Sequence, residues 1–417
     1  MIIRSLSTRI ITNPFFLYAI SFIVVLCSFS LKWSDYYRTI GEGLLSFIVI
    51  TSLIAILLGL LPQIKKKNVF RSIPVSPHNK QLWRCIVSGY VLEFIYCRSI
   101  PFVSIIFNGI GGYRDFEGIP MFHVLLSNIS LFWGIYVFLQ FQSNRHNKHL
   151  RRYVWMSYIP HILLLNRGAI VQLLFSSIFI WLLRIGRLSF KKILYFVAGA
   201  FCFLILFGIM GDARDANSQK DETYILRIGG ATDEFIESNI PKALFWGYMY
   251  TASPLGNVQN AIDHATPHLT WDNFRVLLME SCCPDFIAKR LLQVVPPECA
   301  YDIETYMVTP IFNAPTVYYQ PYLRLGWIGM IWMFGFMVFV VFAYIYLVSS
   351  RSVFFLVGWS SMLSTIALNT FNNMWFFGGL TIITLAILAT LYHQIKQKLQ
   401  NARKKCTPVG FRNRSDL

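Results

Sequence analysis

Long apolar runs, separated by short polar connections, recur along most of the chain. A helix of roughly 20 apolar residues crosses a hydrocarbon core about 30 Å thick, and no water is present there to bond an exposed backbone, so such runs form helices. The pattern predicts an all-α polytopic membrane protein with about ten transmembrane helices. The predicted spans are Pro14–Leu31, Gly43–Leu61, Cys85–Phe107, Met121–Gln142, Tyr153–Leu165, Ala169–Leu183, Ile193–Met210, Tyr322–Val348, Val353–Phe371 and Trp375–His393.

One long hydrophilic segment, 211–321, interrupts this pattern and divides the chain. Residues 1–210 form a transmembrane bundle with spans 1–7, 322–393 hold spans 8–10, and 394–417 are a basic tail. The segment 211–321 is too rich in apolar residues for a disordered linker. We expect a partly helical loop, with helices starting after Thr232, Pro241, Thr270 and Pro284 and a break at Ser253–Asn257.

Composition supports the membrane assignment, and charge orients the chain. Hydrophobic residues make up 55% of the chain, more than a soluble domain of this size can bury, and the net charge is +17. Lys and Arg cluster in alternate connections, which is typical of cytoplasmic loops. Both termini are therefore predicted to be cytoplasmic and the loop 211–321 to be periplasmic. This distribution fits anionic lipid and excludes a nucleic-acid surface.

Arginines supply the first candidate chemistry. Arg167 lies in the turn Asn166–Gly168 between two predicted spans, where it is either a topological residue or a clamp for phosphate. Glu93 and Arg98 share the third span and can pair. Arg214 follows the seventh span between two aspartates that can neutralise it, and Arg227 precedes two glycines that permit a close backbone approach to substrate.

Histidines, carboxylates and cysteines in the loop leave several roles open. His264 and His268 are spaced like a zinc pair, but Pro267 disfavours the helix that would align them, so we expect no metal and no cofactor. Cys299 can form a disulfide with Cys282 or Cys283. His264 is a candidate general base or phosphate contact. The candidate carboxylate bases are Asp233, Glu234, Glu237, Asp263 and Asp272.

Three short stretches resemble the Wzy-type O-antigen polymerases, which are oligosaccharide repeat-unit polymerases of the bacterial inner membrane. The first is Asn166-Arg167-Gly168-Ala169 at a turn. The second is Arg214 followed downstream by Tyr248–Asn257, which is similar to the family's "arginine, then Y-x-x-S-P-x-x-N" pattern. The third is Asn313–Thr316 followed by Tyr322–Gly329, where Arg324 replaces an acidic residue that is common in the family.

This resemblance implies a GT-C-like architecture shared by O-antigen ligases and polymerases, and a glycosyltransferase activity at the periplasmic face. The glycan would move from undecaprenyl diphosphate onto the terminal sugar of another lipid-linked repeat unit. The implied partners are those lipid-linked units and membrane lipid, with a chain-length regulator left open. An O-antigen ligase and a non-enzymatic flippase are the alternatives. The expected catalytic residues are Arg167, Arg214, Arg227, His264 and Asp233, and the expected substrate-binding residues are Tyr248, Tyr250, Ser253, Asn257, Tyr319, Tyr322 and Arg324.

Overall fold

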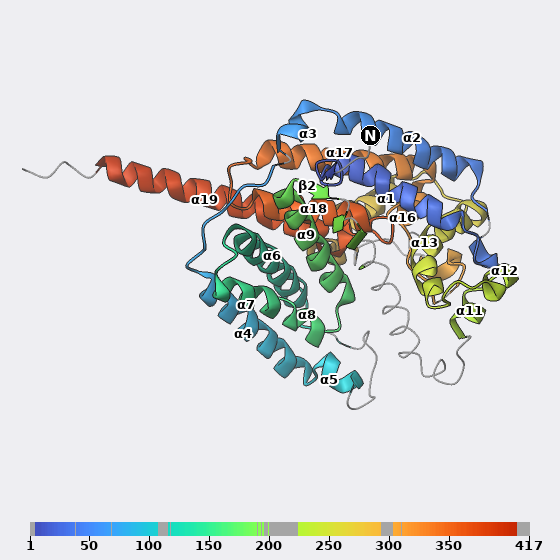
Figure 1. Ribbon diagram of the computed structural model, residues 1–417, viewed down its shortest axis with the longest axis horizontal. Coiled ribbons are helices and arrows are strands. Elements are labelled where there is room, and N and C mark those ends of the chain that lie inside the picture. The colour runs from blue at the N-terminus through green and yellow to red at the C-terminus, as the bar shows by residue number, and fades with distance from the viewer. Residues whose placement is uncertain are drawn as a thin grey trace, which may run out of the picture.

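A computed structural model describes most of the chain, and its described part is predominantly helical (Figure 1). The only sheet among these residues pairs β1 (Ser5–Ser7) with β2 (Arg187–Ser189) in antiparallel fashion. The predominance of helices confirms the all-α fold class. The described residues are 5–37, 39–67, 69–106, 116, 118–189, 191–192, 194–195, 199, 224–292, 303–309 and 311–406.

Five helical segments in this part of the chain are long and apolar enough to cross a membrane. They are α2 (Glu42–Gly59), α6 (Phe122–Ser143), α9 (Arg167–Ile185), α17 (Trp327–Leu347), and the segment Trp375–Gln400, which joins η7 (Trp375–Gly379) to the first part of α19 (Leu380–Cys406). Two shorter apolar helices, α1 (Pro14–Phe29) and α18 (Phe355–Leu368), pack among them. The protein therefore has the fold of a membrane-embedded helical protein, while the GT-C-like architecture stays a prediction.

Other predicted spans differ from the observed helices. The fifth is not one continuous helix, because the chain forms α7 (Lys148–Met156) and then α8 (Ile159–Leu163). Pro160 lies in the first turn of α8, where its missing N–H is tolerated but where it cannot continue a preceding helix. The third span is divided into α4 (Asn79–Cys97) and α5 (Pro101–Ile106). Most of the seventh, Ile193–Met210, lies outside the described residues.

The helices form two hydrophobic clusters. The larger cluster contains α1, α2, α9, α17, α18 and the loop helix α13 (Leu244–His264), and its largest fully buried side chains include Trp359 and Trp375. The smaller one joins α4, α6 and α7 through Tyr90, Trp133 and Leu150. Figure 1 shows α4–α8 together on one side and α11–α13 on the other, with α9 between them.

Local capping predictions in the loop are confirmed. The Thr232 side chain accepts a hydrogen bond from the N–H of Phe235 at the start of α12 (Asp233–Glu237), and Thr270 caps α14 (Trp271–Cys282) in the same way. Pro284 precedes α15 (Asp285–Leu291). The remaining described elements are short: η1 (Asp35–Tyr37), α3 (Pro62–Lys67), α11 (Tyr224–Ile228), η6 (Ile303–Tyr306) and α16 (Tyr319–Leu325).

The predicted break at Ser253–Asn257 is wrong, because α13 continues through Pro254 as one helix of 21 residues. A proline inside a helix costs about 3 kcal/mol. Burial offsets that cost, since Leu255 and Val258 are almost completely inaccessible to solvent and burying one such side chain contributes about 1.5–3 kcal/mol. The aromatic start of α13 is packed inside the protein, where Phe245 is fully buried.

Candidate functional site

Arg167 is the first residue of α9 and is exposed. The turn before it is made by Leu165, which has a left-handed backbone (φ 54°), and by Asn166, whose side chain accepts a hydrogen bond from the N–H of Ala169. A cation is electrostatically unfavourable at a helix N-terminus, where the helix dipole is already positive. The two positive contributions add at this end of α9, so the position favours an anionic group.

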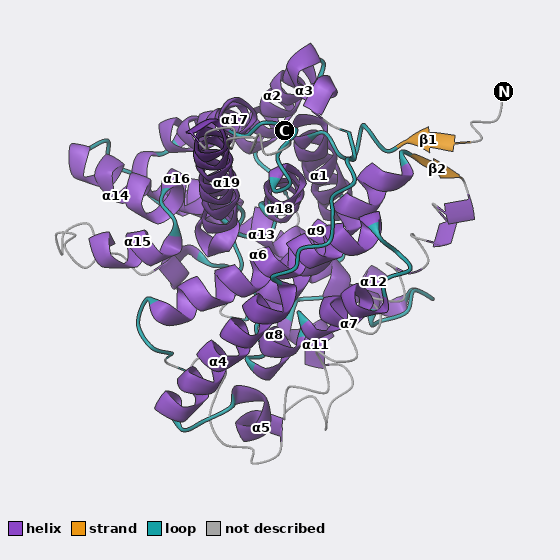
Figure 2. Ribbon diagram, turned by 90° about the vertical axis from the view of Figure 1, so that its left-hand side faces the viewer, coloured by secondary structure: helices purple, strands orange, loops and turns teal. Residues whose placement is uncertain are grey.

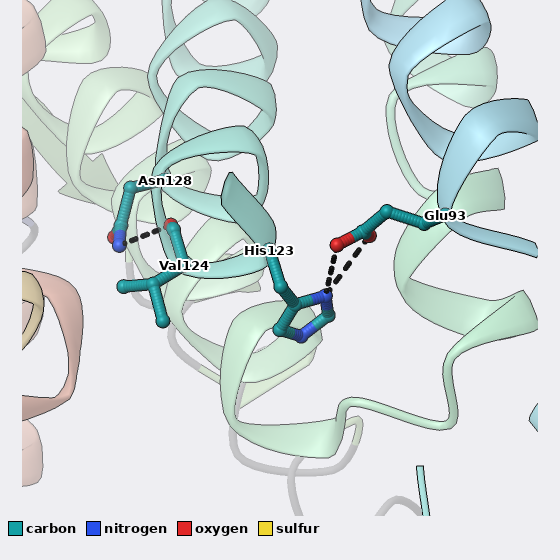
Figure 3. Close-up of polar contacts among 4 residues, drawn as sticks. All are labelled: Glu93, His123, Val124 and Asn128. Carbon is teal, nitrogen blue, oxygen red and sulfur yellow. Dashed lines mark hydrogen bonds and ion pairs between the residues drawn. The ribbon is translucent and has the colours of Figure 1, made fainter. Parts of the chain in front are cut away.

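A carboxylate–imidazole pair lies at the facing ends of α4 and α6 (Figure 3). Glu93 holds His123 Nδ1 with both carboxylate oxygens, at 3.1 and 3.0 Å. The Glu93 side chain is completely buried, and that of His123 is 27% exposed. Glu93 therefore does not form the predicted pair with Arg98, which ends α4 as an exposed residue with a left-handed backbone. When Nδ1 carries the proton toward Glu93, Nε2 is free to accept a proton from a substrate.

His161 lies just before the start of α9. Its imidazole is fully buried, and neither ring nitrogen has a hydrogen-bond partner within the described part of the chain. The His161 carbonyl accepts a hydrogen bond of 2.9 Å from the N–H of Asn166, the residue before Arg167. Helices α6 and α9 run in parallel, since Asn128 and Gln172 both approach Gly378 and Arg184 Nη1 donates to Gln142 Oε1. The Glu93–His123 pair, His161 and Arg167 therefore lie at the same end of the bundle, as a polar assembly.

Five residues further along α6 and α9, polar groups surround the kink in η7. Gly378 in η7 has φ 94°, and a Cβ placed on it would lie 2.6 Å from Asn128 Oδ1 and 3.6 Å from Gln172 Oε1. The Asn128 amide donates to the Val124 carbonyl (Figure 3). Among the described residues, Gln172 Nε2 and Thr365 Oγ1 are buried without a hydrogen-bond partner. Each buried polar group without a partner costs about 1–3 kcal/mol of stability. The region around Gly378 therefore favours contact with water or a polar ligand.

The loop candidates do not form one cluster. Arg227, on α11, and Asp233, on α12, are exposed near the start of α13, where Phe235 packs on Phe245 with ring centroids 5.2 Å apart. His264 is exposed at the other end of α13, and a helix of this length extends about 30 Å. The structure therefore separates His264 from Asp233, and the two cannot act on the same atom.

The glycines after Arg227 serve internal packing. A Cβ on Gly229 would lie 2.5 Å from the Phe245 ring, and one on Gly230 would lie 2.9 Å from the ring of Tyr36. Here the backbone approaches aromatic side chains of the protein, where close approach to substrate was expected. Arg214, the remaining catalytic candidate, lies outside the described residues.

Most of the expected substrate-binding residues are buried. Asn257 is completely inaccessible, and its amide bonds the backbone of 308–314: Nδ2 donates to the carbonyls of Phe312 and Ala314, and Oδ1 accepts from the N–H of Val308. Ser253, Tyr248, Tyr319 and Tyr322 are also buried, whereas Tyr250 is half-buried. These contacts support structural roles, and substrate binding by these residues stays a prediction.

Arg324 has an internal partner. Its Nε donates to Oε2 of Glu280 on α14 at 2.9 Å, and Nη2 donates to Oε1. The loop thus supplies a carboxylate beside the start of α17, where the sequence has arginine in place of the expected acid. The pair connects α14 to α16 and holds the loop against the bundle.

Within the described part of the chain, no group of histidine, cysteine and carboxylate side chains is placed to hold a metal ion. Cys282 and Cys283 are free thiols there. The disulfide with Cys299 stays a prediction, because Cys299 lies outside the described part.

Fold and site together define an all-α membrane protein with a charged, histidine-containing polar assembly at one end of its bundle. Comparisons of the chain with protein-family models, curated proteins and solved structures found no match. The two histidines of the assembly were not singled out from the sequence. An available signal was Glu93 itself, because an ionisable residue inside a predicted span needs a partner.

Proposed function

We propose that the protein is a membrane-embedded glycosyltransferase of the O-antigen polymerase type. It transfers a growing glycan from undecaprenyl diphosphate to the terminal sugar of a second lipid-linked repeat unit at the periplasmic face. The observation that carries the proposal is that exposed Arg167 and the Glu93–His123 pair lie at the same end of the parallel helices α6 and α9. This arrangement offers a cation and a proton acceptor on one side of an apolar bundle, as transfer from a lipid-linked diphosphate requires.

The reaction divides between these groups. The acceptor hydroxyl oxygen forms a bond to the anomeric carbon of the donor glycan, and the bond from that carbon to the diphosphate oxygen breaks. The electron pair leaves with undecaprenyl diphosphate, whose developing charge Arg167 stabilises. The hydroxyl proton goes to His123 Nε2, while Glu93 holds the ring and stabilises the imidazolium. Glu93 is a positioning residue, because its contact is with His123.

The test is extension of purified undecaprenyl-diphosphate-linked repeat units by the purified full-length protein, with products separated by length. Arg167→Ala is expected to reduce the rate about 10²–10³-fold, as for loss of one electrostatic stabiliser. His123→Gln is expected to reduce it about 10²–10⁴-fold, as for loss of a general base. Arg275→Ala is the matched control, because Arg275 is an exposed arginine of α14 that pairs with neighbouring Asp272.

A deletion strain separates the alternatives. Loss of a polymerase leaves a single repeat on the lipid core, loss of a ligase leaves none, and loss of a flippase traps the unit on the cytoplasmic leaflet. Full extension by both Arg167→Ala and His123→Gln would reject the site but keep the activity. No extension by the wild-type protein, with a ligase or flippase phenotype in the strain, would reject the function.

A further inference from the structure

A second site lies at the opposite end of α9. A pocket of ≈ 300 Å³ is formed where the N-terminal segment, the connection before α4 and the end of α9 meet. Arg184, which lines it, follows Arg167 by 17 residues, or about 26 Å along the helix. That distance is close to the thickness of a hydrocarbon core. The pocket is therefore at the end of the bundle that the charge pattern assigns to the cytoplasm.

Arginines contribute to the lining of the pocket. Arg9 and Arg184 line it, and none of its lining residues is a carboxylate. Arg184 Nη1 and Arg145 Nη2 both donate to the same Gln142 Oε1, at 3.2 and 2.8 Å, which holds two guanidinium groups beside one neutral acceptor. Like charges held together in this way repel each other, and an anion between the helices relieves the repulsion.

Hydrogen bonds between backbone groups and from a threonine side chain hold the segments of the pocket together. The N–H of Thr8 donates to the carbonyl of Gly186 at 3.2 Å, continuing the β1–β2 pairing, and Thr12 Oγ1 donates to the Thr8 carbonyl at 2.9 Å. Gly186 ends α9 with a left-handed backbone, which turns the chain into β2. Figure 2 shows the two strands of this small sheet side by side. The two arginines therefore lie on two chain segments that these hydrogen bonds hold together.

Apolar side chains complete the lining and distinguish between possible anions. Val69, Phe70 and Leu183 share the pocket with the two arginines, and Val69 is 42% exposed. A free phosphate ion gains nothing from the three apolar side chains. A phospholipid, in contrast, places its phosphate at the arginines and its glycerol and first methylenes against the apolar side chains. Basic pockets between helices on the cytoplasmic side are typical sites for lipid headgroups.

We propose that this pocket binds the phosphate headgroup of one anionic phospholipid on the cytoplasmic side. The site is independent of the proposed transferase chemistry, since it lies at the other end of α9. An arginine near an anionic membrane surface contributes about 1 kcal/mol, or about fivefold in affinity. The double variant R9Q/R184Q is therefore expected to bind the lipid about thirtyfold more weakly.

The experiment is native mass spectrometry of the full-length protein in detergent, titrated with phosphatidylglycerol, with phosphatidylcholine of the same acyl chains, or with inorganic phosphate. The matched control is R151Q/R152Q, which removes two exposed arginines of α7 from the same predicted face. The wild type and this control should retain one phosphatidylglycerol, and R9Q/R184Q should lose it. R9Q alone, expected to bind about fivefold more weakly, keeps the test valid if loss of Arg184 impairs folding.

Two results would overturn the proposal. An equal loss of phosphatidylglycerol in R151Q/R152Q and R9Q/R184Q would mean that overall charge, with no defined site, governs retention. Binding of inorganic phosphate as tightly as phosphatidylglycerol would assign the pocket to a free anion and reject the lipid.

Discussion

Replacement of Arg324 by alanine tests whether this buried arginine has a structural or a substrate-binding role. The side chains of Arg324 and Glu280 are 4% and 14% exposed, and two hydrogen bonds join them. Arg324→Ala leaves the Glu280 carboxylate without its partner in a largely buried site. Breaking one side of a buried ion pair costs about 3–5 kcal/mol. Because Glu280 retains some access to solvent, we expect a loss near the lower value.

The measurement is the free energy of unfolding by SDS titration in mixed micelles, completed as a double-mutant cycle. The double variant R324A/E280A should be more stable than R324A, since it no longer buries an unpaired carboxylate. The control is Arg275→Ala, which removes an ion pair with Asp272 whose side chains are 54% and 52% exposed. An exposed pair of this kind contributes about 0.3–0.5 kcal/mol.

The structural account fails if R324A and R275A lose the same small amount of stability. It also fails if R324A is fully stable yet cannot extend lipid-linked glycans, because Arg324 would then act on substrate.

Three further predictions concern other described residues. Asn257→Ala leaves three backbone groups without the hydrogen bonds of the Asn257 amide, at a cost of about 1–3 kcal/mol each. Limited proteolysis should therefore cut 303–314 faster than in wild type, and an unchanged cleavage rate would contradict the structural role of Asn257. Gly378→Ala places a Cβ on a left-handed backbone and against Asn128 Oδ1, so it should lower the SDS concentration at which half of the protein is unfolded. Adding Asn128→Ala should restore only part of this loss, because the cost of about 1–2 kcal/mol for the left-handed backbone remains. Burial raises the pKa of the Cys282 thiol to about 12, so in a variant that keeps Cys282 as its single cysteine, maleimide should label it slowly at pH 8 and rapidly after denaturation in SDS. Fast labelling in the folded protein would refute the burial.

The local features of this fold were predictable because their causes are local. Whether a run of apolar residues can cross a membrane depends on its own length and not on the residues packed around it. A threonine caps a helix through its own side chain and the next few N–H groups, as Thr232 and Thr270 do. The turn predicted at Asn166–Gly168 lies earlier in the structure: Leu165 and Asn166 form it, and Arg167 and Gly168 already belong to α9.

The errors came from positions where tertiary packing outweighs local preference. Pro254 disfavours a helix locally, yet α13 continues through it because its neighbours are buried against other helices. Glu93 had a charged neighbour along its own helix, but its carboxylate bonds His123, 30 residues away on α6. Arg324 likewise pairs with Glu280, 44 residues before it.

The sequence by itself determined that this is a helical membrane protein and which short motifs begin several of its helices, because hydropathy and capping depend on neighbouring residues. Only the tertiary structure decided which ionisable side chains meet. It joined His123 to Glu93 and placed this pair at the same end of the bundle as the start of α9, and it separated Asp233 from His264 along the length of α13. The reason is physical: such contacts depend on how helices pack against one another, and single-residue patterns do not record that packing.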